Sequence, residues 1–375
     1  MGAFVEYLQK QYDPMVEMLR SMVELESPST CKQAVNKLVD YLASKFQEIG
    51  AAVQIIEQEN SGNHLLASWG TGEEQILVLC HMDTVWPLGE IKKRPFRIEG
   101  DKAFGPGVFD MKGGLVQAYY ALKAVIDNGT HISQKIVFLC TSDEETGSQS
   151  SRALIEEQAA KSTFVLVPEP AVGPEGAVKR SRKGWGLYHL IVTGKSAHAG
   201  NDHDKGISAI EEISRQIIRL HAMTDPVKGT TVNVGFVNGG TLANVVADRA
   251  EAKIDLRATS QMELERAEDK ILGLQPLMDG TMVKISGQIN RPPLEATVQN
   301  RELYEKAKRI ARRLGLELGG KNVGGVSDGN FTSALGIPTL DGIGAVGDGA
   351  HALHEYVLLS CMVKRAALIA ELFVE

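Results

Sequence analysis

The segment Ile76-Leu-Val-Leu-Cys80 is a short apolar run that leads directly into His81-Met-Asp83. Two further strand-like runs end in acidic residues: Ile136-Val-Phe-Leu-Cys140 precedes Asp143-Glu144-Glu145, and Phe164-Val-Leu-Val167 precedes Pro168-Glu169-Pro170. Short apolar runs of this kind are typical of buried strands. A carboxylate or imidazole where a buried strand ends is costly to desolvate unless something pairs it, and a divalent cation does this well. We therefore interpret these strand ends as parts of a two-metal hydrolase site.

A further acidic residue, Asp110, lies in the glycine-flanked segment Gly107-Val-Phe-Asp110-Met-Lys-Gly113-Gly114, ahead of a helix predicted over Leu115–Ile126. The paired glycines allow a close approach of the backbone. Asp110 can therefore either cap that helix or bind a metal ion. The local pattern leaves both roles open.

The other candidate residues also have two interpretations. In an extended strand His81 and Asp83 face the same side, so Asp83 can fix the tautomer of a metal-bound imidazole, or the two can form a surface pair. Glu144 and Glu145 are either a solvated acidic turn or a general base beside a metal ligand. The flanking prolines restrict the backbone of Glu169, which suits a fixed ligand as well as a plain loop.

The bulk composition restricts the class of protein. The chain has 375 residues, of which 43% are hydrophobic and 23% charged, with a net charge of −7. This acidic balance argues against nucleic acid as the main partner, and no apolar stretch reaches the roughly 18 residues that span a bilayer. The N-terminus has no basic start or cleavage site of a secretory signal, and the four cysteines form no CxxC pair. We expect a soluble cytoplasmic protein with no membrane partner.

The pattern along the chain predicts two domains. Helical and strand-like segments alternate over residues 1–178 and again over 292–375, which predicts an α/β domain with a mostly parallel mixed sheet flanked by helices. Residues 179–291 read instead as an inserted α+β domain with four strands and two helices. The strands are expected near Leu187–Val192, Thr231–Val237, Ala252–Ala258 and Met282–Gly287, and the helices near Ile207–His221 and Gln261–Gly273. A last helix is expected from about residue 357.

The order of these motifs resembles a known enzyme family. His81-x-Asp83, Asp110, Glu144-Glu145, Glu169 and a late histidine follow one another as in the co-catalytic zinc peptidases. This family includes glutamate carboxypeptidases, acetylornithine deacetylases, succinyl-diaminopimelate desuccinylases and aminoacylases, and the chain is most similar to the glutamate carboxypeptidase-like branch. The resemblance extends into the insert, through Gly194-Lys-Ser-Ala-His198-Ala-Gly200, Lys205-Gly-Ile-Ser-Ala209 and Asn238-Gly-Gly-Thr-Leu-Ala-Asn244-Val-Val.

The resemblance implies two zinc ions per chain, with manganese or cobalt as substitutes for the same donors. His81, Asp110 and Glu169 would hold one ion. Asp110, Glu145 and the late histidine would hold the other, so that Asp110 bridges the two. Asp83 would orient His81, and Glu144 would be the general base that takes a proton from a metal-bridging water.

Two histidines compete for the late position in Gly349-Ala-His351-Ala-Leu-His354-Glu355. The family places the ligand after a glycine and a small residue, about four residues before a glutamate. This favours His351, and His354 is then a neighbouring loop residue.

The insert would act as a lid and as the surface of a homodimer, as it does in the family. Its His198 resembles a residue that stabilises the oxyanion, and Asn244 and Arg291 resemble groups that hold the substrate. Arg291 would pair with a free α-carboxylate. The basic stretch Lys179-Arg-Ser-Arg-Lys183 is either a solvated linker or a second anion clamp.

The expected reaction is carboxypeptidase-type hydrolysis of an amide bond next to a free α-carboxylate, in a small peptide or an N-acyl amino acid. Ala177 stands where a glutamate-specific relative carries a substrate-binding lysine, which puts a strict preference for glutamate in doubt. Two alternatives keep the scaffold: an N-acyl-amino-acid deacylase, or a di- or tripeptide aminopeptidase. A third is a catalytically silent homologue that binds a small metabolite.

Overall fold

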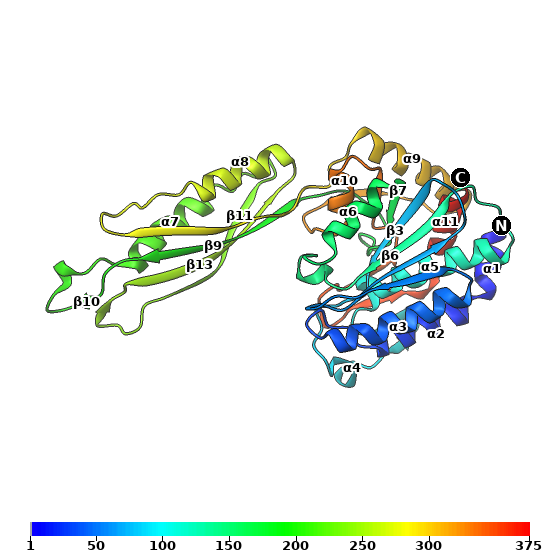
Figure 1. The fold of residues 1–375 in the computed structure, drawn as a ribbon, viewed down its shortest axis with the longest axis horizontal. Helices are drawn as coiled ribbons and strands as arrows, with labels where there is room; N and C mark the ends of the chain where they lie inside the picture. The colour runs from blue at the N-terminus through cyan, green and yellow to red at the C-terminus, as the bar shows by residue number, and fades with distance from the viewer. Residues whose placement is uncertain (1) are drawn as a thin grey trace. The chain divides into compact units, whose positions relative to one another are not determined.

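A computed structural model describes residues 2–375, and the chain divides into two compact units (Figure 1). The first contains the chain up to Arg180 together with Ala296–Val323 and Ser327–Glu375, and the second contains Ser181–Glu295 and Gly324–Val326. The boundaries therefore lie a few residues beyond the predicted 178 and 291. Arg182 and Leu294 exchange backbone hydrogen bonds of 2.9 and 3.1 Å, which keeps both connecting segments within the second unit.

The first unit is built on an eight-stranded mixed sheet in the order β1-β2-β6-β3-β7-β16-β8-β15. The four central strands run parallel: β6 (Lys135–Thr141), β3 (Gln75–His81), β7 (Ser162–Val167) and β16 (Thr339–Asp341). The outer strands are β1 (Ala52–Ile56), β2 (His64–Trp69), β8 (Val178–Arg182) and β15 (Gly320–Val323). Of these, β2 and β8 pair antiparallel with the central strands. The predicted α/β class with a parallel sheet centre is confirmed.

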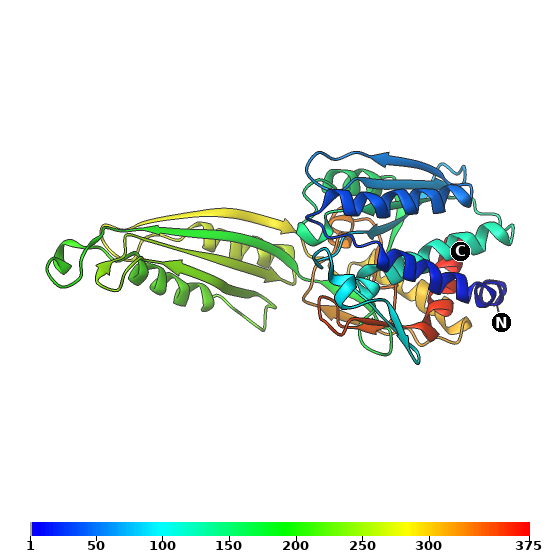
Figure 2. The same cartoon turned by 90° about the horizontal axis from the view of Figure 1, so that it is seen from below.

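Helices cover both faces of this sheet (Figures 1 and 2). Every residue of β3 is buried, and its side chains alternate between two apolar clusters. Ile76 and Val78 join the larger cluster, with helices α1 (Ala3–Lys10), α2 (Tyr12–Glu24), α3 (Lys32–Glu48), α5 (Gly113–Asp127), α9 (Val298–Arg313) and α11 (Met362–Val374). Leu77 and Leu79 face α6 (Arg152–Ala160) and α10 (Gly329–Ala334). Burial on both faces explains the unbroken apolar run in the sequence.

The last helix begins later than predicted. α11 starts at Met362, because Tyr356–Leu358 forms strand β18 instead of a first helical turn. β18 pairs antiparallel with β5 (Lys102–Phe104) in a small sheet ordered β17-β18-β5-β4. The other two strands are β17 (Gly347–Asp348) and β4 (Arg97–Glu99), and the short helix α4 (Glu90–Lys93) precedes β4.

The second unit has the predicted succession of four long strands and two helices. The strands β9 (Gly184–Thr193), β11 (Thr231–Gly239), β13 (Arg249–Ala258) and β14 (Met282–Arg291) form an antiparallel sheet ordered β11-β13-β9-β14. Helices α7 (Ala209–His221) and α8 (Gln261–Leu272) pack on it through a separate apolar core that includes Ile213, Leu264 and Ile254. The short strands β10 (Ala197–His198) and β12 (Val245–Val246) form their own antiparallel pair.

None of the helices within residues 2–375 is both long enough and apolar enough to cross a lipid bilayer.

Candidate metal centre

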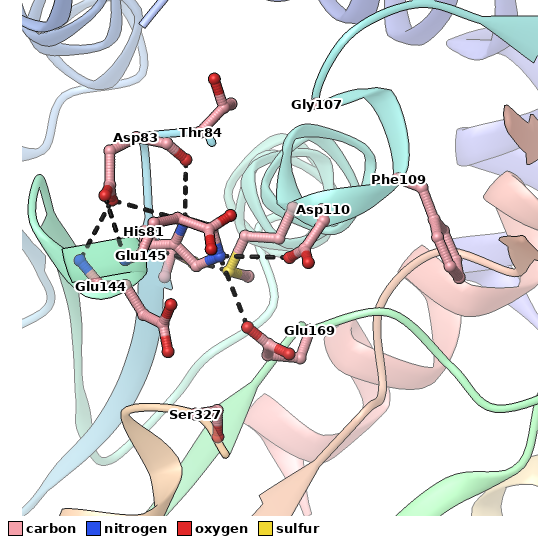
Figure 3. Close-up of polar contacts among 12 residues, drawn as sticks. His81, Asp83, Thr84, Gly107, Phe109, Asp110, Glu144, Glu145, Glu169 and Ser327 are labelled. Atoms are coloured by element: carbon pink, nitrogen blue, oxygen red, sulfur yellow. Dashed lines mark hydrogen bonds and ion pairs between the residues drawn. The ribbon is translucent and has the colours of Figure 1, made fainter. Parts of the chain in front are cut away.

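His81 is the last residue of β3 and is almost completely buried. Its Nε2 atom lies 3.2 Å from Asp110 Oδ1 and 3.5 Å from Glu169 Oε1. Its Nδ1 atom lies 3.0 Å from the backbone oxygen of Asp83 (Figure 3). An acceptor at Nδ1 favours the tautomer with the proton on that nitrogen, so the lone pair of Nε2 is directed at the two carboxylates.

Asp83 contacts His81 differently from the prediction. β3 ends at His81, so the strand periodicity does not extend to Asp83, and the backbone oxygen is closer to the imidazole than Oδ1, which lies 3.5 Å away. The carboxylate of Asp83 accepts the backbone N–H groups of Glu144 and Glu145 at 3.3 and 3.2 Å, and the hydroxyl of Ser29 at 2.7 Å. Asp83 thus ties the end of β3 to the Glu144–Glu145 turn, which follows β6.

Asp110 faces two imidazoles with its two oxygens. Oδ1 lies near His81, whereas Oδ2 lies 3.4 Å from Nε2 of His351. Nε2 of His351 also lies 3.1 Å from Oε2 of Glu145. Two triads of ligand atoms therefore share Asp110: His81 with Asp110 and Glu169, and Asp110 with Glu145 and His351.

The capping role considered for Asp110 is not what the structure shows. Helix α5 begins at Gly113, its N-cap is Lys112, and no side chain caps it by a hydrogen bond. Asp110 instead lies in a turn between Gly107 and α5, with a cis peptide bond to Met111.

The carboxylate of Glu355 holds the turn that carries Asp110. It accepts backbone N–H groups from Gly107 at 2.9 Å, Phe109 at 3.0 Å and Asp110 at 3.1 Å, and the indole N–H of Trp86 at 2.9 Å. Glu355 is buried, and burial raises its pKa while these hydrogen bonds lower it. Since Glu355 follows His351 by four residues, it joins the segments that carry two of the ligand residues.

We expect Glu355→Gln to destabilise this arrangement. An amide has one accepting oxygen and would turn its NH2 group toward two of the four donors, which costs roughly 1–3 kcal/mol for the buried groups left unpaired. Urea unfolding would measure the loss, and a metal titration should show weaker uptake because Asp110 is no longer held. The exposed Glu317→Gln serves as a matched control. Unfolding of E355Q at the wild-type urea concentration would contradict this role.

The late histidine in the second triad is His351. Nε2 of His354 lies instead 4.0 Å from Oδ2 of Asp348, and both of those side chains are exposed. His351 has a positive φ of 60° and follows Gly349 at φ 83°. This tight turn directs the imidazole of His351 toward Glu145 and Asp110.

Two glycines set the backbone of Glu169, the residue that follows Pro168. A Cβ atom on Gly114 would lie 1.7 Å from the backbone oxygen of Pro168, and one on Gly344 would lie 1.9 Å from it. Both approaches are open only to glycine. The predicted close approach at Gly113-Gly114 thus places the ligand segment after β7 against the start of α5.

The electrostatics of the site are those of an anionic cluster that needs positive charge. Hydrogen bonds to Asp110 and Glu145 raise the pKa of His351 to about 10. Burial lowers the pKa of His81, but hydrogen bonds to carboxylates, chiefly Asp110, outweigh it and hold this pKa well above its usual value. Burial also raises the pKa of Glu145. The negative surroundings that favour protonation of the two imidazoles also favour divalent cations in place of those protons.

The donors fit a pair of borderline divalent metal ions. Each triad offers one imidazole nitrogen and two carboxylate oxygens whose atoms lie within 4.8 Å of one another. Mixed nitrogen and oxygen ligation suits zinc, manganese and cobalt. Three ligands per ion would leave a coordination position open, as in catalytic rather than structural sites.

Glu144 is in position for a role distinct from that of Glu145. The two adjacent residues form a short 3₁₀ turn after β6, and Glu145 contacts His351. The carboxylate of Glu144 belongs to neither triad, and its negative charge adds to the hydrogen bonds that raise the pKa of His81. One glutamate is thus a ligand candidate and the other is available for proton transfer.

The three predicted substrate residues belong to the second unit. His198 lies on β10 and is exposed, and its Nδ1 accepts backbone N–H groups from Gly200 and Asn201 at 3.1 and 3.0 Å. The backbone oxygen of Asn244 accepts the N–H of Ala199 at 2.9 Å, so the segments of His198 and Asn244 are adjacent.

Arg291, the third of these residues, ends β14 and is buried. Its Nη1 donates to Oδ1 of Asn290 at 3.0 Å. The roles of all three in substrate binding stay predictions.

Three residues that contact the site were not among the predicted site residues: Ser29, Lys179 and Glu355. Ser29 donates to Asp83, Glu355 accepts from the Asp110 turn, and Nζ of Lys179 lies 3.2 Å from Oε2 of Glu169. The spacing of four residues between His351 and Glu355 was a signal for Glu355, but it was used only to choose between the two histidines. Ser29 lies in a polar loop with no distinguishing pattern.

The chain is similar to known proteins over most of its length. The model of peptidase family M20/M25/M40 matches residues 77–375. The chain is 28% identical over 374 residues to carboxypeptidase G2 from Pseudomonas sp. (strain RS-16), covering 96% of this chain and 89% of that relative. It is 28% identical over 276 residues to acetylornithine deacetylase from Proteus mirabilis, covering 68% and 69%.

Among solved structures, aminopeptidase PepT from Bacillus cereus ATCC 10987 matches with a TM-score of 0.77 and 22% identity, over 96% of this chain and 98% of that one. At this identity the match shows a shared fold. The family match establishes membership of the family, because it spans well over half of the chain; the matched residues include both triads. The chain therefore belongs to the metallopeptidase family M20/M25/M40.

Proposed function

We propose that this enzyme is a dinuclear zinc metallopeptidase of the carboxypeptidase type, which hydrolyses an amide bond next to a free α-carboxylate. The observation that carries the proposal is the position of Asp110, whose two oxygens face the imidazoles of His81 and His351. A carboxylate so placed is suited to bridge two cations. Zinc suits the donors, and manganese or cobalt can replace it.

The bound ions would polarise the scissile carbonyl and lower the pKa of the attacking water. Glu144 then acts as general base: its carboxylate takes a proton from that water and delivers it to the leaving nitrogen. Asp83 supports this step, because its carboxylate accepts the backbone N–H of Glu144 while its backbone oxygen lies 3.0 Å from Nδ1 of His81. Its hydrogen bonds hold the base and the ligand in a fixed relation.

Residues of the second unit are proposed to bind the substrate. Nδ1 of His198 accepts two backbone N–H groups, which favours the proton on Nε2 and makes that exposed nitrogen a donor for an oxyanion. Asn244 and Arg291 are proposed to hold the substrate, with Arg291 pairing with its α-carboxylate. The similarity to carboxypeptidase G2 over nearly the whole chain supports a C-terminal residue such as glutamate, or an N-acyl amino acid, as the group recognised.

The family resemblance supports a homodimer formed through the second unit, with closure of that unit over the substrate as a lid. A cytoplasmic location is consistent with Cys31, Cys80, Cys140 and Cys361, all of which are free thiols.

Deacylation of an N-acyl amino acid is the second candidate, and the similarity to acetylornithine deacetylase favours it. A di- or tripeptide aminopeptidase would in addition need an acidic group for the α-amine of its substrate. The silent homologue is set aside, because the chain belongs to a peptidase family and retains both triads and Glu144.

A matched pair of substrates tests the proposed specificity. With zinc added, the enzyme should hydrolyse an N-acyl-glutamate at least about 100-fold faster, in kcat/KM, than the same compound with its α-carboxylate converted to an amide, because a site built for a carboxylate rejects an analogue that lacks it. A chelator should abolish both rates. Fast cleavage of a free-amine tripeptide alone would overturn the carboxypeptidase assignment in favour of the aminopeptidase.

A further inference from the structure

A lysine lies beside one of the two triads. Lys179, in β8, places Nζ 3.2 Å from Oε2 of Glu169, and the two side chains are only 10% and 7% exposed. The other oxygen of the same carboxylate, Oε1, lies 3.5 Å from Nε2 of His81. One oxygen of Glu169 therefore faces the candidate metal position, and the other pairs with the ammonium group of Lys179.

The second triad has no such neighbour. Across residues 2–375, neither Glu145 nor Asp110 forms an ion pair with a lysine or arginine. Their ion-pair partners are the imidazoles of His81 and His351, and His351 is half exposed. The two triads have the same number and kind of donors, but Lys179 pairs with a carboxylate of the first and with none of the second.

We propose that Lys179 makes the two metal positions unequal: it weakens binding of a divalent cation by His81, Asp110 and Glu169, so that the position of Asp110, Glu145 and His351 fills first. The inference rests on the proposed two-metal function. The ammonium repels a divalent ion a few ångströms away in a poorly screened site. It also donates to Oε2, which leaves Glu169 with one oxygen for the metal.

Lys179 also orients Glu169, and this effect on metal binding is opposite to that of its charge. A residue that orients a ligand from outside the coordination shell strengthens metal binding, typically by about 10- to 100-fold. If orientation of Glu169 dominates, removal of Lys179 weakens metal binding at this triad. If repulsion dominates, removal of the lysine charge strengthens it. Burial of the pair favours repulsion, because a charge next to a doubly charged ion is poorly screened there.

Variants with one triad each make the measurement specific. His351→Ala leaves the triad that contains Glu169, and His81→Ala leaves the other. Cobalt is titrated into the full-length, metal-free chain, and binding is followed by calorimetry and by the visible absorption of the bound ion. In the H351A background, Lys179→Met should tighten cobalt binding about tenfold or more. In the H81A background the affinity should stay within about twofold, because that site lacks the ion pair.

Three controls complete the design. Lys179→Arg keeps the charge and should leave the H351A site weak. Lys179→Gln keeps a hydrogen-bond donor without the charge; it should tighten the site as Met does, and it replaces the Met variant if that protein does not fold. Lys161→Met removes a lysine paired with Glu157 at 2.6 Å on the exposed face of α6, and should change neither site.

The outcomes separate this inference from the proposed function. Unchanged or weaker cobalt binding in the H351A/K179M protein, with two ions still bound by the wild type, overturns the role of Lys179 alone. A wild-type chain that binds no cobalt or zinc overturns the proposed function, and the inference with it.

Discussion

Replacing Asp110 with asparagine should empty both metal positions at once. An asparagine offers one neutral oxygen, and its NH2 group would face the second imidazole, so it cannot serve both triads. We expect the metal content after dialysis to fall from two ions per chain to less than one. Loss of the ions removes several kcal/mol of transition-state stabilisation, so that kcat/KM should fall on the order of 10³-fold or more.

Thermal unfolding distinguishes loss of the site from loss of the fold in this variant. Without metal, D110N should still unfold cooperatively but at a lower temperature than the metal-free wild type, because it loses the carboxylate that faces both imidazoles. Zinc at about 1,000 times its Kd should stabilise the wild type by about 4 kcal/mol and leave D110N almost unchanged. Asp279→Asn, at an exposed position, is the control, and both its metal content and its stabilisation by zinc should equal those of the wild type. Two ions retained by D110N would refute a bridging role.

Replacing Glu144 with glutamine should have the second-largest effect, on the rate alone. The amide cannot take a proton from water, and loss of a general base lowers kcat by about 10²- to 10⁴-fold. Metal content should stay at two ions, because Glu144 belongs to neither triad. KM should change only a few-fold, since the substrate contacts proposed for the second unit are intact.

A steady-state assay combined with elemental analysis checks this prediction. Glu157→Gln, on the exposed surface of α6, is the matched control and should retain full activity. Loss of one metal ion from E144Q would show that Glu144 is a ligand, and an unchanged kcat would remove it from proton transfer.

Much of the first unit was readable from local pattern, because its central strands are buried on both faces. Their apolar runs end at or within one residue of the ends of β3, β6 and β7, and the polar residues there supplied three of the five residues that form the two triads. The helix expected over Leu115–Ile126 was also correct, since Asn128 and Gly129 follow its last turn. The last helix was predicted too early, because strand pairing of Tyr356–Leu358 with β5 outweighs the local apolar pattern.

Local pattern could not show which contacts hold the candidate ligands in place. Glu355 reaches the Asp110 turn from some 245 residues away, and Lys179 reaches Glu169 from a strand at the far side of β16. Both act through tertiary hydrogen bonds, which leave no periodic trace in the chain. The choice between capping and bridging for Asp110 was open for the same reason.

By itself the sequence determined the chemistry of the strand ends, since an imidazole or carboxylates lie within a few residues of the end of each apolar run. The tertiary structure decided which ends are neighbours. The order β6-β3-β7 brings Glu145, His81 and Glu169 to one edge of a parallel sheet, and the turn held by Glu355 sets Asp110 between two imidazoles. The physical reason is that strand order depends on packing between distant segments, whereas burial and hydrogen-bonding preference are properties of each residue.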